Sequence, residues 1–224
     1  MELLLWALLT LLGVWAALDA TSVGQFMISR PLVTGTLTGL CLGDPLTGFH
    51  LGLALELIHL GAVPAGAARV PDPGPAAIGG AVLAVTVGGG GGVVLGTALG
   101  MILSVLGGVT IVSQRRLNGR LVQSLEEGDF SPGALERRVR VAIVTDGLRG
   151  GILTVMGVGV ALALSAPLAR WWPVGDGSSW MILVVLLAMP LGIVTRVVSP
   201  NGKPLALLAL GGLGGFVAGW WLLP

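Results

Sequence analysis

The sequence predicts an all-helical integral membrane protein that crosses the bilayer several times. Hydrophobic residues make up 54% of its 224 residues and charged residues only 10%, and the mean hydropathy is +0.94. These values lie outside the range of soluble globular domains. Apolar runs also recur near the length of about 20 residues that spans a bilayer. The runs are 2–18, 31–43, 45–63, 76–112, 141–168, 180–198 and 203–223.

The first run is predicted to be a retained helix. A cleaved signal peptide begins with positive charges, whereas the only early charge here is Glu2, and the apolar stretch continues to Leu18. We treat residues 1–224 as a single membrane domain.

Several later runs predict broken or re-entrant helices in place of simple spans. The runs 31–43 and 45–63 are short and abut, while 76–112 is too long for one helix and contains five consecutive glycines at 88–92. Non-helical backbone at membrane depth is tolerated only where protein or a water-filled cavity surrounds it, as at transport sites. Broken or re-entrant helices are therefore expected in these runs, next to protein or a water-filled cavity.

Small residues predict close helix packing. Gly35 and Gly39 are four residues apart, as are Gly48 and Gly52, and this spacing lets helix backbones approach closely in lipid. The single cysteine, Cys41, is predicted to be a small buried apolar residue.

The segment 114–149 is predicted to be a cytoplasmic helical loop. It holds seven of the twelve basic residues, which by the positive-inside rule places it in the cytoplasm. It is interpreted as a solvated segment that sets the topology, with a docking surface for a cytosolic partner as the alternative. Tryptophans near turns and near the end are predicted to be interfacial anchors without a ligand role: Trp171, Trp172, Trp180, Trp220 and Trp221.

Polar residues concentrate in the block 19–72. An ionisable group inside the bilayer costs roughly 2.5–3.5 kcal/mol on insertion scales, so each needs a partner or a function. By contrast, the runs 76–112 and 180–223 contain only Arg196 and Lys203 as ionisable residues. The residues of the block are Asp19, Gln25, Arg30, Asp44, His50, Glu56, His59, Arg69 and Asp72.

Glu56 is the strongest candidate for ligand contact, because apolar residues flank it on both sides and it should line a polar cavity. The alternative is a hydrogen bond with His59, three residues later on the same helical face. Gln25 and Glu56 together would bind sugar-type hydroxyls. A side-chain amide both donates and accepts hydrogen bonds, and a carboxylate accepts them strongly. Helix-to-helix hydrogen bonding is the alternative for Gln25.

The remaining charges have structural alternatives. Arg30, Asp44 and Arg69 are predicted to form internal ion pairs or caps, and Asp72 either caps a helix or contacts a ligand. The single Glu-x-x-His motif and two histidines do not predict a metal site. Without a phosphate-binding loop or nucleophile elbow, no catalytic residue and no cofactor is predicted. The net charge of +1 gives no reason to expect nucleic acid.

The polar block resembles the enzyme IIC subunit of the mannose/fructose/sorbose-type sugar phosphotransferase system. The matching positions, in order, are Asp19, Gln25-Phe26, Arg30-Pro31-Leu32, Gly35, Gly39, Leu42-Gly43-Asp44, Gly48, Gly52, Leu55-Glu56, Leu60-Gly61, Gly66-Ala67-Ala68 and Pro71-Asp72.

This resemblance implies a non-catalytic permease subunit in the bacterial inner membrane, with a mobile core domain moving against a scaffold. It implies a trimer of pairs with a IID-like membrane subunit, and a hexose phosphorylated by cytosolic IIB, which receives phosphate from IIA. By similarity, the sugar-binding positions are Gln25, Glu56 and Asp72. Asp19, Arg30, Asp44, His59 and Arg69 are possible supporting residues.

The sequence departs from the family at "AVPAGAA", residues 62–68, where many relatives have an aromatic residue and an asparagine before Gly-Ala-Ala. The leading hypothesis is a sugar-translocating subunit. This departure motivates the alternative, a divergent non-transporting membrane scaffold or receptor that keeps the same fold.

Overall fold

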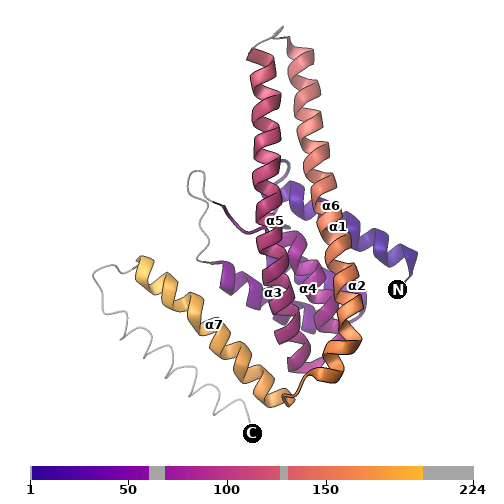
Figure 1. Cartoon of the computed structure of the whole chain (residues 1–224), viewed down its shortest axis with the longest axis vertical. Helices are drawn as coiled ribbons and strands as arrows, with labels where there is room; N and C mark the ends of the chain where they lie inside the picture. Colours follow the sequence, from indigo (N-terminus) through magenta and orange to yellow (C-terminus); the bar gives the residue numbers. More distant parts are fainter. Residues whose placement is uncertain (1, 61–68, 127–130, 199–224) are drawn as a thin grey trace.

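The computed structural model describes residues 2–60, 69–126 and 131–198, and this part of the chain is all-helical (Figure 1). Three of its helices are long and apolar enough to cross a membrane: Leu3–Thr21, Gly89–Gln123 and Pro132–Trp171. The "AVPAGAA" segment and the predicted run 203–223, with Trp220 and Trp221, lie outside the described residues.

Helix α1 (Leu3–Thr21) corresponds to the first apolar run and packs against α4 (Pro73–Val87) and α6 (Pro132–Trp171). Leu9 of α1 packs with Ile78 of α4 and Val158 of α6 in the largest apolar core. This core is built from helices far apart in the sequence, so α1 is an integral part of the fold.

Helices α2 (Pro31–Leu42) and α3 (Pro45–His59) form an antiparallel hairpin of two short helices. At about 1.5 Å per residue they rise about 18 and 22 Å, less than the roughly 30 Å of hydrocarbon in a bilayer. Gly43, at φ 83°, ends α2, and the Asp44 carboxylate caps α3 by accepting from the Thr47 amide at 3.0 Å. Of the two roles predicted for Asp44, ion pair or cap, the structure shows the cap.

The predicted glycine contacts hold this hairpin together. A Cβ atom added to Gly35 would lie 2.9 Å from the Gly52 Cα, and one added to Gly48 would lie 2.8 Å from the Gly39 Cα. No real Cβ comes so close to backbone, so only glycine permits this packing. Cys41 is exposed, contrary to prediction, because it follows Gly39 by two residues and points away from the face that packs on α3.

Substituting Gly48 with alanine is expected to destabilise the protein by about 1–3 kcal/mol, because the new methyl group meets backbone that cannot move aside. Gly119→Ala is the control: no atom lies within 4 Å of its added Cβ, and alanine favours a helix. Thermal unfolding in detergent should show a lower midpoint for Gly48→Ala alone. Equal midpoints for both variants would contradict the tight packing.

Helix α4 is the centre of the fold, and the break in the long apolar run lies where the glycines predict it. Residues Gly74 to Ala84 of α4 are all buried, and helices α1, α2, α3, α5 and α6 surround it. Gly88, with a φ of 79°, separates α4 from α5 (Gly89–Glu126), and Gly89, the first residue of α5, also has a positive φ of 60°.

The glycine run also makes room for two indoles. Cβ atoms added to Gly90 and Gly91 would lie 2.9 Å from Trp180 and 2.8 Å from Trp172. Trp180 belongs to α7 (Asp176–Val198), and Trp172 Nε1 donates to Ser179 Oγ at 2.9 Å. Of the predicted anchors Trp171, Trp172 and Trp180, only Trp171 is largely exposed, at 81%. Trp172 and Trp180 therefore help to pack α7 onto α5, a role that the anchor interpretation did not include.

Helices α5 and α6 run side by side and extend far beyond the rest of the fold as a two-helix hairpin (Figure 1). Gln114 of α5 donates to Thr145 Oγ1 of α6 at 2.8 Å and to the Ala142 carbonyl at 3.1 Å. The predicted loop 114–149 is thus mostly a continuation of both helices. Its last arginine, Arg149, lies in the core and not in solvent.

Candidate functional site

The segment after α1 forms a tight turn around the Asp19 carboxylate. Asp19 is 2% exposed; its Oδ1 accepts from the Phe26 amide and its Oδ2 from the Ser29 amide at 2.9 Å. Inside the turn, Gln25 and Met27 have φ of 60° and 65°, a left-handed conformation that non-glycine residues adopt only where the surroundings enforce it. The Gln25 side chain is exposed. We call residues 22–30 the Gln25 turn.

Glu56 links the end of α3 to the start of α2. Arg30 Nη1 donates to Glu56 Oε1 at 3.1 Å, and the Leu32 amide lies 3.4 Å from Oε2. The Glu56 side chain is 17% exposed and the Arg30 side chain 57%. Arg30 therefore forms an internal ion pair, as predicted, and the Glu56 carboxylate sits at the end of the Gln25 turn.

The alternative for Glu56, a hydrogen bond with His59, is not formed. His59 Nδ1 donates to its own helix at the Leu55 carbonyl, 2.7 Å away, and Nε2 lies 3.0 Å from Ser104 Oγ on α5. Glu56 is paired with Arg30 instead, and the second ring nitrogen of His59 contacts the Ser104 hydroxyl of α5. The reason is tertiary: the partners come from helices that the spacing within α3 does not reveal.

Ser104 also fixes the start of α4, because its carbonyl accepts from the Asp72 amide at 2.9 Å. One buried residue of α5 thus ties the end of α3, through His59, to Asp72. Nothing in the sequence around Ser104 distinguishes it as a site residue.

Asp72 occupies the N-cap position of α4, but its side chain makes no capping hydrogen bond. Its carboxylate, in a residue 2% exposed, accepts from Arg149 Nη1 at 2.6 Å. The capping alternative is therefore wrong: Pro75 at the N3 position has no N–H to donate, and the side chain turns toward α6, where it pairs with the buried guanidinium of Arg149.

Arg149 bridges two carboxylates. Its Nε donates to Asp146 Oδ1 at 2.9 Å, and Nη1 also contacts Thr110 Oγ1 at 3.2 Å. The Arg149 side chain is 8% exposed, and its Nη2 has no hydrogen-bond partner among the residues that the structure describes.

The second oxygen of Asp146 reaches back to α1 and the Gln25 turn. Asp146 Oδ2 accepts from Thr21 Oγ1 at 2.9 Å and from Ser22 Oγ at 2.6 Å. Together these contacts connect α1, α4, α5 and α6. We call the set the Arg149 network: Arg149, Asp72, Asp146, Thr110, Thr21 and Ser22.

Two predicted supporting residues lie apart from these groups. Asp44 is at the α2–α3 turn, the end of the hairpin opposite Glu56. Arg69 is exposed, so its predicted internal pairing or capping is not supported by its burial. No group of three or more His, Cys, Asp or Glu residues that could hold a metal occurs in the described ranges.

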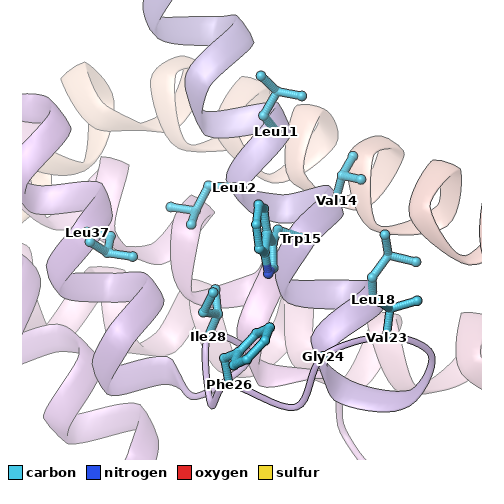
Figure 2. A pocket seen from close by; sticks show the side chains of 10 residues that line it. All are labelled: Leu11, Leu12, Val14, Trp15, Leu18, Val23, Gly24, Phe26, Ile28 and Leu37. Carbon is cyan, nitrogen blue, oxygen red and sulfur yellow. The ribbon is translucent and has the colours of Figure 1, made fainter.

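A cavity of about 650 Å³ lies beside the Gln25 turn, between α1 and α2, but its chemistry is apolar (Figure 2). Figure 2 shows Trp15 above Ile28 and Phe26, with Leu12, Leu18 and Leu37 around them. None of its ten lining residues is charged. The cavity therefore offers no charged or amide side chain for hydroxyl recognition.

A family model described as "PTS system sorbose-specific iic component" matches residues 3–170. The chain belongs to this enzyme IIC family. The matched range includes α1 to α6, and with them the Gln25 turn, Glu56 and the whole Arg149 network. It is a multi-pass bacterial membrane protein of the mannose/sorbose/fructose class, as its resemblance implied.

Curated relatives of this enzyme IIC chain match part of it. It is 39% identical over 93 residues to the sorbose-specific EIIC component of Klebsiella pneumoniae, and 37% identical over 93 residues to the mannose-specific EIIC component of Escherichia coli. Each alignment covers 42% of this chain and 34% of the relative. The alignments thus span about a third of the length of these relatives.

Solved structures share the fold. A cryo-EM structure of the mannose transporter ManYZ in complex with a microcin superposes with a TM-score of 0.64 and 21% identity, over 100% of this chain and 96% of that one. Another, described as a membrane protein, gives a TM-score of 0.70 and 20% identity, over 100% and 97%. Both structures therefore share the overall helical fold of this chain.

Proposed function

We propose that this chain is the sugar-translocating IIC subunit of a mannose-type, phosphoenolpyruvate-dependent phosphotransferase system. It binds a hexose and passes it across the inner membrane for phosphorylation by a partner subunit. The observation that carries this proposal is the family match over residues 3–170, which contains all three expected sugar-binding positions. The subunit itself performs no covalent chemistry.

Gln25 and Glu56 are the proposed hydroxyl-binding pair. The Gln25 side chain is exposed on a turn whose backbone is held by Asp19, and its amide can both donate to and accept from a hydroxyl. The Glu56 carboxylate is partly exposed and already oriented by Arg30, so it can accept hydroxyl hydrogens strongly. Asp72 is the third proposed position, where a hydroxyl would share the carboxylate with Arg149.

The proposed partners follow from the same assignment. A IID-like membrane subunit would pair with this chain, three such pairs forming a trimer, and cytosolic IIA and IIB subunits would supply phosphate. The end of the α5–α6 hairpin carries six of the twelve basic residues and is the proposed cytoplasmic contact for IIB. The second candidate function is a non-transporting scaffold or receptor, favoured by the departure at "AVPAGAA".

Sugar uptake tests the proposal. The chain is expressed with its IID-like neighbour and the soluble subunits in cells that lack a mannose-type permease, and phosphorylated mannose, glucose, fructose and N-acetylglucosamine are measured. Glu56→Gln is expected to lower uptake about tenfold or more, because the neutral amide accepts hydroxyls less strongly. Glu2→Gln is the control, because Glu2 is exposed and its side chain makes no capping hydrogen bond before α1. Assembled complexes that take up none of the sugars would support the scaffold.

A further inference from the structure

The Arg149 network connects the two segments that carry the proposed sugar-binding residues. Arg149 Nη1 holds Asp72 at the start of α4, and Arg149 Nε holds Asp146, whose other oxygen accepts from Thr21 and Ser22. Ser22 precedes Gln25 by three residues. A single buried guanidinium thus joins the beginning of the Gln25 turn to Asp72.

The far end of the Gln25 turn is fixed to the same helix. A Cβ added to Gly74 would lie 2.6 Å from the Ser29 carbonyl oxygen, so the turn packs on α4 two residues after Asp72. From inside, Asp19 holds the Phe26 and Ser29 amides. The position of Gln25 relative to Asp72 is therefore set at both ends of the turn, by packing at Ser29 and by hydroxyl hydrogen bonds at Thr21 and Ser22.

We propose that Arg149 is a positioning residue of the sugar site. Through Asp146, Thr21 and Ser22 it sets where Gln25 lies relative to Asp72, and it touches no sugar. The inference rests on the proposed function. Arginine is required because two nitrogens of one rigid plane donate to two carboxylates, Nε to Asp146 and Nη1 to Asp72. A lysine ammonium is a single point charge and lacks this fixed geometry.

The sharpest test removes the link to the turn while the buried ion pairs stay. The double substitution Thr21→Val with Ser22→Ala deletes both hydroxyl donors to Asp146 and leaves Arg149 paired with Asp72 and Asp146. Thr10→Val is the matched control, since Thr10 is in the same helix and its hydroxyl only bonds to the Trp6 carbonyl. Binding of radiolabelled mannose, or of whichever of the four tested hexoses binds wild type, is measured on the purified complex.

The double variant is expected to raise the dissociation constant about tenfold, as expected when a binding group is misplaced by a fraction of an ångström. Its unfolding midpoint should fall, because Asp146 Oδ2 loses both donors, but by no more than that of Asp44→Ala, a cap variant remote from Glu56 that serves as the stability-matched control. Arg149→Lys should shift binding in the same direction, with Arg140→Lys, an exposed arginine of α6, as its control. If Arg149→Lys does not fold, the double variant Thr21→Val with Ser22→Ala still tests whether the network positions Gln25.

A combination with Gln25→Ala separates positioning from general damage. If the hydroxyls act through Gln25, adding Thr21→Val and Ser22→Ala to Gln25→Ala causes no further loss beyond about twofold. Wild-type affinity in the double variant, or losses that multiply with Gln25→Ala, would overturn the inference and leave the proposed function standing. Absence of hexose binding in the wild-type complex would instead refute the proposed function, and this inference with it.

Discussion

Replacing Arg149 with methionine is expected to lower the free energy of unfolding by about 3–5 kcal/mol, the range found when one partner of a buried ion pair is removed. Methionine has a similar volume but leaves Asp72 and Asp146, with side chains 2% and 4% exposed, without their cation. The network joins four helices, so its loss should weaken the whole core. Chemical or thermal unfolding of the purified protein in detergent measures the effect.

Arg140→Met is the matched control, on the same helix. Arg140 pairs with Glu136 at a site where both side chains are more than 60% exposed, 72% and 64%, and exposed pairs contribute about 0–1 kcal/mol. An unfolding midpoint for Arg149→Met that coincides with that of Arg140→Met would show that the buried network does not stabilise the fold.

Substituting Asp19 with alanine is expected to destabilise the protein by about 2–4 kcal/mol and to abolish measurable hexose binding. The change leaves the Phe26 and Ser29 amides without their acceptor, and each buried unpaired group costs about 1–3 kcal/mol. Without that acceptor, the left-handed backbone at Gln25 and Met27 is no longer enforced. Unfolding and labelled-hexose binding are measured on the same preparation.

Asp44→Ala provides the comparison for Asp19→Ala. It removes the α3 cap, at a cost of about 0.5–2 kcal/mol, at the end of the hairpin remote from Glu56. It should therefore destabilise the protein without changing hexose affinity. If both variants lose binding in proportion to stability, Asp19 does not organise the site specifically.

Features with a local cause could be predicted from the sequence. The glycine pairs of α2 and α3, the cap at Asp44 and the break at Gly88 each depend on residues close together in the chain, and the structure has them where predicted. The Arg30–Glu56 contact is longer in range, but the cost of an unpaired charge in lipid already required a partner for Glu56.

Contacts between distant helices could not be predicted in the same way. His59 bonds Ser104, 45 residues later, and nothing in the α3 sequence distinguishes that partner from Glu56. The sequence pattern predicts a solvated position for Arg149, because six other arginines precede it in the same segment. A signal was present: Asp146 and Arg149 are three residues apart inside an apolar stretch, the spacing of an ion pair on one helical face.

Direct binding of a hexose to Glu56 variants tests the central claim most directly. Saturable binding of labelled mannose, glucose, fructose or N-acetylglucosamine is measured on the purified complex of wild type, Glu56→Gln and the control Glu136→Gln. A sugar-translocating subunit should bind at least one of these hexoses, with affinity reduced about tenfold or more in Glu56→Gln and unchanged in Glu136→Gln. Equal affinity in all three proteins would contradict the assignment of the sugar site to Glu56.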